Sequence, residues 1–65
     1  MKLYGIFRVF KNDALSLMTV ETGNPFKFRA HSALIFEDEY DAITYAKLNV
    51  SVEYIVLPLD IKVNP

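Results

Sequence analysis

The sequence predicts a small α+β fold: a mostly antiparallel sheet of about four strands with one helix packed on one face, in the order β-β-β-α-β. Two observations carry this prediction. Several segments alternate in side-chain character with a period of two, as strands do, and turn-forming residues separate them. Only residues 37–50 have the apolar spacing of a helix. The 65 residues are expected to form one domain, 1–65.

The first two strands are expected at residues 1–11 and 14–22. In the first, Leu3, Phe7 and Val9 lie on one side, and the other side mixes apolar, aromatic and charged residues. Because both sides are partly apolar, this strand is expected near the middle of the sheet. Asn12 and Asp13 are favourable turn residues and predict the reversal between the two strands.

The third strand is expected to begin at Phe26, after the strong turn signal of residues 23–25. Lys27, Arg29 and His31 alternate along it and share one side. The alternation becomes irregular at Ser32, which predicts a bulge or break near His31 and Ser32.

The single helix is expected within residues 37–50, with Asp38 as its N-cap. Ala42 and Ala46 share one face, and their small side chains would let the helix lie close to a sheet. The last strand is expected within residues 52–63. Its apolar alternation is interrupted on the opposite side by Pro58, which indicates a sheet edge or a bulge.

Composition narrows the chemistry. There is no cysteine and only one histidine, so we expect no disulfide, no metal site and no cofactor. The net charge of −1 argues against a general affinity for nucleic acid, which typically needs a basic excess. No segment is long enough to span a bilayer and no signal peptide is evident, so a cytoplasmic location is expected, without a membrane partner.

One helix covers only part of a four-stranded sheet, so one sheet face is expected to be open. Aromatic and cationic side chains on an exposed face are typical of protein interfaces, and also of platforms that stack single-stranded bases. The residues assigned to this open face are Tyr4, Ile6, Arg8, Phe10, Lys27, Arg29, Tyr54 and Val56.

No pattern indicates catalysis, and the protein is not expected to be an enzyme. His31 has no nucleophile or carboxylate suitably placed beside it, because Ser32 would point to the opposite face of the strand. The acidic residues Glu37, Glu39 and Asp41 favour the start of the helix. They also form an alternative patch that could dock on a basic partner.

One stretch carries a resemblance. The segment "ALIFEDEYDAITYAKLNVSVEYIVLPLDI" is similar to the C-terminal part of small phage and plasmid proteins, and "MKLYGIFRVF" resembles the opening strand of small early proteins of tailed phages. This resemblance covers about half of the chain. It implies a non-catalytic accessory protein that binds and inhibits one host protein, such as a nuclease, a toxin or a CRISPR or restriction effector.

The leading hypothesis is therefore an anti-defence or host-takeover factor, with a host protein as partner, acting in the host cytoplasm. Two alternatives remain open: a regulator that binds single-stranded nucleic acid, which is disfavoured by charge, and a structural homodimer. The predicted partner-binding residues on the sheet are Tyr4, Arg8, Phe10, Lys27, Arg29 and Tyr54. The alternative acidic patch comprises Glu37, Glu39 and Asp41.

Overall fold

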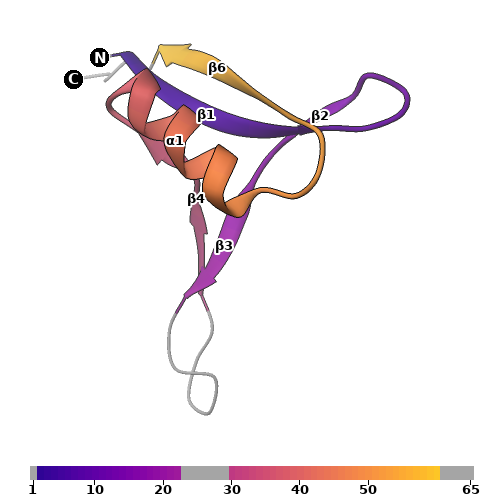
Figure 1. Ribbon diagram of the computed structural model, residues 1–65, viewed down its shortest axis with the longest axis horizontal. Helices are drawn as coiled ribbons and strands as arrows, with labels where there is room; N and C mark the ends of the chain where they lie inside the picture. The colour runs from indigo at the N-terminus through magenta and orange to yellow at the C-terminus, as the bar shows by residue number, and fades with distance from the viewer. Residues whose placement is uncertain (1, 23–29, 61–65) are drawn as a thin grey trace, which may run out of the picture.

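The computed structural model describes residues 2–22 and 30–60, and it has the predicted α+β architecture (Figure 1). The strands are β1 (Lys2–Val9), β2 (Leu15–Leu17), β3 (Thr19–Thr22), β4 (Ala30–Ala33), β5 (Ile35–Phe36) and β6 (Tyr54–Asp60). The single helix is α1 (Glu39–Asn49). All strand pairs are antiparallel.

Strand β1 is the centre of the main sheet, as its two partly apolar sides predicted. It pairs along its whole length with β6 on one side. On the other side, its second half pairs with β2 and its first half pairs with β5. The sheet is therefore at most three strands wide, although four strands contribute to it.

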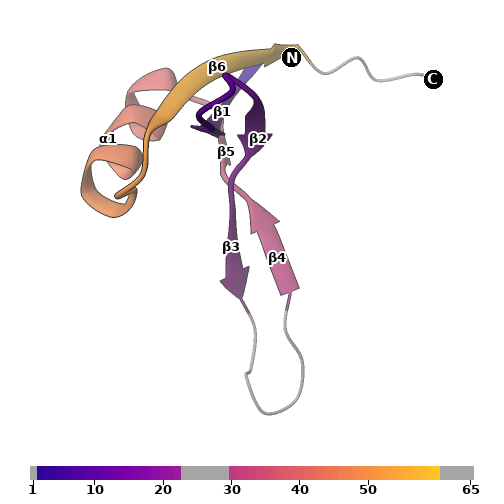
Figure 2. The ribbon, with the colours of Figure 1, turned by 90° about the vertical axis from the view of Figure 1, so that its right-hand side faces the viewer.

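The strands beside β1 divide at a three-way junction. The backbone N–H of Ile6 donates to the carbonyl of Leu34 (3.1 Å), that of Leu34 to Met18 (2.9 Å), and that of Met18 to Ile6 (2.9 Å). This closed ring of hydrogen bonds satisfies backbone groups that the ordinary strand pairing leaves out at the branch point. Beyond the junction, β3 and β4 pair with each other and project from the sheet as a two-stranded arm (Figures 1 and 2).

Two predictions about strand continuity need correction. Residues 14–22 do not form one strand. The segment stops pairing with β1 at Met18 and continues as β3, which pairs with β4 in the arm. The predicted break near His31 and Ser32 lies instead at Leu34, and His31 is inside β4. Both interruptions have the same cause, since Met18 and Leu34 are members of the junction. The turn before β2 is as predicted, with Asp13 at a positive φ of 64°.

Helix α1 begins and packs as its sequence predicted. The Asp38 carboxylate accepts a hydrogen bond from the Tyr40 backbone N–H (2.8 Å), which is an N-cap. Ala42 and Ala46 are wholly buried against Ile6 and Leu34, which together form the buried core. The helix thus lies close to the sheet, and Phe36 and Tyr45 pack with ring centroids 5.5 Å apart.

Helix α1 connects β5 to β6, and the topology fixes the side of the sheet that it covers. Because β5 and β6 are both antiparallel to β1, they run parallel to each other with β1 between them. Connections of this kind are right-handed in about 98% of proteins. The handedness of the β5–α1–β6 connection therefore determines which face of the sheet the helix covers. The relative hydrophobicity of the two faces does not determine it.

Candidate functional site: an uncovered apolar sheet face

The strand register places ten residues on the sheet face away from α1, and all ten are nonpolar. Directly opposed residues of antiparallel strands point to the same side. The register pairs Phe7 with both Leu17 and Ile55, and Gly5 with both Leu57 and Ile35. The full set, named here the uncovered face, is Leu3, Gly5, Phe7, Val9, Leu15, Leu17, Ile35, Ile55, Leu57 and Leu59.

The centre of the uncovered face is closely packed around Gly5. A Cβ atom at Gly5 would lie 3.0 Å from Leu59 Cδ1, 3.0 Å from Phe7 Cε1 and 3.1 Å from Leu17 Cδ1. The side-chain ends from three strands therefore meet above the glycine. This arrangement makes the middle of the face a continuous apolar surface, with no gap at the position that lacks a side chain.

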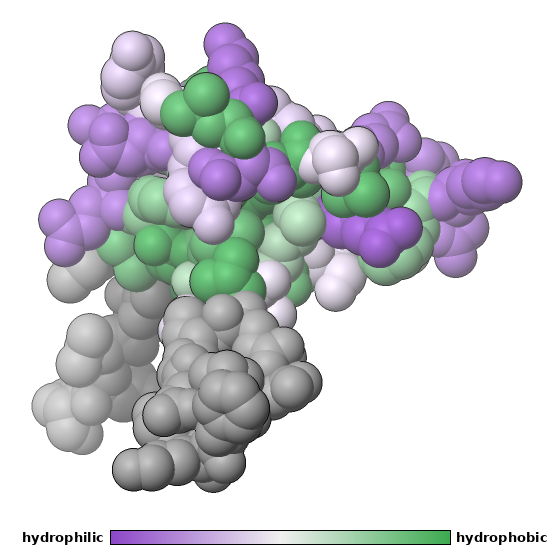
Figure 3. All heavy atoms as spheres, turned by 60° about the horizontal axis from the view of Figure 1, so that its bottom comes forward, coloured by the Kyte–Doolittle hydropathy of each residue, from purple (hydrophilic) through white to green (hydrophobic). Residues whose placement is uncertain are grey.

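The rim of the uncovered face is accessible to solvent. Leu15 is 47% exposed and Ile55 is 41% exposed, whereas the central residues are half-buried by one another. Helix α1 lies on the other side of the sheet, and within residues 2–22 and 30–60 no helix covers this side (Figure 2). The space-filling view of Figure 3 shows the helix side of the molecule from below, where hydrophobic and hydrophilic groups are mixed, and the uncovered face is on the far side.

The predicted identity of the open face is wrong. Tyr4, Ile6, Tyr54 and Val56 lie on the helix-covered side: Ile6 is wholly buried, and the other three are partly buried against the core. The cause is that both sides of β1 are apolar, so periodicity alone does not identify the covered side. The partner-binding roles assigned to Tyr4 and Tyr54 remain predictions, but the face they occupy is not the open one.

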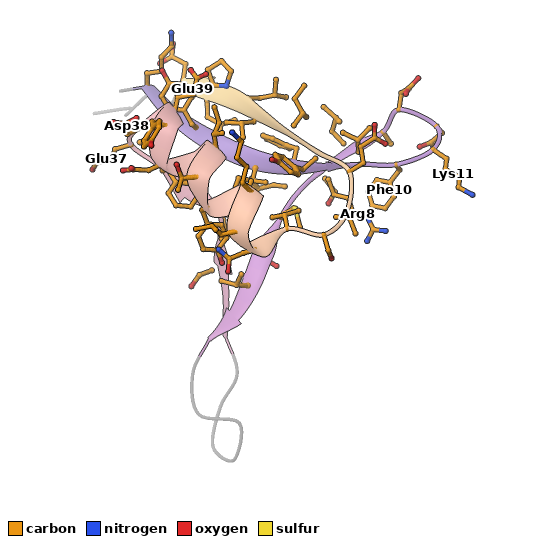
Figure 4. The ribbon with its side chains drawn as sticks, viewed as in Figure 1. Arg8, Phe10, Lys11, Glu37, Asp38 and Glu39 are labelled. Carbon is orange, nitrogen blue, oxygen red and sulfur yellow. The ribbon has the colours of Figure 1, made fainter. Side chains whose placement is uncertain are left out.

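Arg8 was also assigned to the open face, but it pairs with Tyr54 and therefore points to the helix side. It lies with Phe10 at the end of the sheet, near the turn that precedes β2 (Figure 4). Both are exposed, and the Arg8 guanidinium carbon lies 4.9 Å from the centre of the Phe10 ring, a cation–π contact. Lys11 lies at the same end. Asp13, in the turn after Lys11, offsets part of this positive charge.

Two other predicted residues, Lys27 and Arg29, lie outside the described residues. The structure therefore does not place them beside Arg8 and Phe10.

The acidic patch lies at the opposite end of the molecule from Arg8 (Figure 4). Glu37, Glu39 and Asp41 are exposed around the start of α1. Glu39 and Asp41 are in the first helical turn, where negative charge interacts favourably with the helix dipole. The structure thus gives these residues a role in helix stability, and their role in docking remains a prediction.

The structural description of residues 2–22 and 30–60 includes no pocket and no group of three or more side chains arranged to hold a metal ion. No helix in the same residues is long and apolar enough to cross a membrane. The main feature that these residues offer to a partner is the uncovered face.

Comparisons with known proteins found no match to this chain among protein-family models, curated proteins or solved structures.

The sequence shows the apolar alternation that makes up the uncovered face, but it does not show that this side of the sheet lacks a helix. The alternation of Ile55, Leu57 and Leu59, and that of Leu3, Phe7 and Val9, are both visible in the sequence. A strand side with no polar residue is typical of a buried core. With Tyr4 and Tyr54 assigned to the open face, the opposite side was the one left for the helix to cover. The informative signal was that the sheet has two apolar sides while the chain has only one helix to cover them.

Proposed function

We propose that this protein is a non-catalytic protein-interaction domain that binds another polypeptide through the uncovered face. The single observation that carries the proposal is that ten residues on this face are all nonpolar and that its rim is exposed. Contiguous apolar surface of this kind on a small domain is usually an interface, because leaving it in water is unfavourable.

The finer part of the proposal concerns the class of partner. The resemblance to small early phage proteins supports an inhibitor that occludes a functional surface of one host protein in the host cytoplasm. Two surfaces are available for that contact: the uncovered face and the acidic patch of Glu37, Glu39 and Asp41. The uncovered face has the stronger support, since the acidic residues already stabilise the start of α1.

Single-stranded nucleic acid is less well supported as a partner. The proposal of a base-stacking platform depended on Tyr4 and Tyr54 being on the open face, but both pack on the helix side. Phe7 is the only aromatic residue among the ten residues of the uncovered face, and none of the ten is a cation. Stacking platforms combine several aromatic rings with cationic residues that follow the phosphate backbone.

The proposed function is tested by affinity capture with matched variants. Ile55→Glu places a charge on the uncovered face, and Leu48→Glu places the same charge on the exposed surface of α1, where Leu48 is 78% exposed. We expect the wild type and Leu48→Glu to retain one stoichiometric polypeptide, and Ile55→Glu to lose it. The retained polypeptide is then purified and the binding is repeated with the two components alone.

A third variant distinguishes the two surfaces. Reversing the charges of Glu37, Glu39 and Asp41 to lysine should leave capture unchanged if the uncovered face makes the contact. Equal retention by the wild type and Ile55→Glu would contradict the proposed role of this face.

A further inference from the structure

The described core of one chain is small for a domain of this length. Its buried hydrophobic residues are Ile6, Leu34, Ala42 and Ala46, and Ile6 is the only large side chain that is wholly buried. The 65-residue sequence has no cysteine, so no disulfide can compensate. Domains of this size are marginally stable on their own core and often add a disulfide, a metal or a partner subunit.

The uncovered face is large enough to supply the missing burial. From Leu3 to Val9 it measures about 20 Å, and across three strands about 15 Å, or roughly 300 Å² in projection. The accessible surface of protruding side chains exceeds their projection. Two such faces packed together give about 600 Å² in projection, and the relief of the side chains raises the accessible area toward the approximately 1,000 Å² of total buried area that a specific interface requires.

A second copy of the chain is the occupant that best satisfies this need. If the fold requires its uncovered face to be buried, the partner must be present whenever the chain is made, and only another copy is always available in equal amount. The face also suits self-association, because a surface without charges meets no like charge when it packs against itself. The net charge of −1 adds little repulsion between copies.

The edge of the sheet is less suited to self-association than its face. In the described residues β6 pairs only with β1, so its other edge is free. Pro58 lies in the middle of β6 and has no backbone N–H to donate. Proline in an edge strand opposes the pairing of a further strand. Growth of the sheet through the β6 edge is thereby disfavoured.

We propose that two copies of this chain form a symmetric dimer in which their uncovered faces pack together, an inference that rests on the proposed function and names a second copy as the polypeptide bound. A host protein that binds the same face would compete with this second copy. The two sheets would lie about 10 Å apart, as in β-sandwiches, with the two α1 helices on the outer surfaces. Because β1 is the central strand, Gly5 and Phe7 would lie near the two-fold axis, and Leu15 and Ile55 would lie toward the rim.

The test is the mass of the protein in solution, measured by sedimentation equilibrium from about 1 µM to about 500 µM. We expect the wild type and Leu48→Glu to have twice the 7.5 kDa mass of one chain in the upper part of this range. We expect Ile55→Glu to raise the dimer dissociation constant about tenfold or more, because the interface would bury an unpaired carboxylate.

A second measurement uses only the wild type and so does not depend on the folding of a variant. Thermal unfolding of the wild type should occur at a higher temperature as the protein concentration rises, because dimerisation stabilises the folded state by mass action. A folded wild-type monomer at all concentrations, with an unfolding temperature independent of concentration, would overturn the dimer.

The two proposals fail differently. If the wild type is monomeric but Ile55→Glu still abolishes capture of a different polypeptide, the dimer is wrong and the proposed function stands. If Ile55→Glu changes neither mass nor capture, both proposals are wrong.

Discussion

Ile6 is the residue at which most parts of this fold meet. Its backbone belongs to the ring of hydrogen bonds that links β1 to the backbone of Met18 and Leu34. Its side chain is wholly buried against Ala42 and Ala46 of α1. A single apolar residue therefore links the central strand, the branch point of the arm and the helix.

Truncation of Ile6 should accordingly be costly. We expect Ile6→Ala to lower the free energy of unfolding by about 2–5 kcal/mol, since it leaves a cavity that the two small alanines of α1 cannot fill. The matched control Leu48→Ala shortens a side chain that is 78% exposed, and should change the same quantity by less than about 0.5 kcal/mol. Urea titration followed by circular dichroism measures both. Equal effects of the two substitutions would show that Ile6 is not the centre of the core.

At the scale of elements, α1 is the part of the fold that the sequence predicted most completely. Its N-cap and its buried alanines were both visible, because each depends on residues close together in the chain. The strands were predicted less well. Their composition identified them, but the interruptions at Met18 and Leu34 arise from a junction between segments far apart in sequence, which no local pattern reports.

The N-cap provides a test at this scale. We expect Asp38→Ala to destabilise the protein by about 0.5–2 kcal/mol, because the Tyr40 backbone N–H loses its acceptor. Asp38→Asn retains a side-chain oxygen that accepts the same hydrogen bond, and should recover most of the loss. Thermal unfolding measured at a fixed protein concentration compares the three proteins. An equal loss in both variants would indicate that the charge of Asp38 matters and that its hydrogen bond does not.

At the scale of the whole molecule, the fold class was predicted correctly but the candidate site was placed on the wrong side of the sheet. Periodicity separates the two faces of a strand, and it assigned Phe7 and Ile55 to one face and Tyr4 and Tyr54 to the other. It does not determine which face the helix covers. That choice follows from the path of the chain from β5 through α1 to β6, a property of the topology.

The uncovered face differs in chemistry from the open face that the sequence predicted. A mixed aromatic and basic face would suit either nucleic acid or protein, whereas the uncovered face offers only apolar contacts. Arg8 and Phe10 lie at one end of the sheet, and the acidic patch lies at the other (Figure 4). Arg8 shares the side of Tyr54 and the acidic patch lies at the start of α1, so these charged groups are on the helix side and the uncovered face itself carries none.

The most direct test of the uncovered face as an interface is an isotope-filtered nuclear Overhauser experiment on a concentrated mixture of labelled and unlabelled chains. This measurement detects only contacts between different molecules. We expect intermolecular signals from the side chains of Phe7, Leu57 and Leu59, and none from Leu48 on the exposed surface of α1. Intermolecular signals confined to α1 or to the edge of β6, or no such signals from a folded sample, would contradict it.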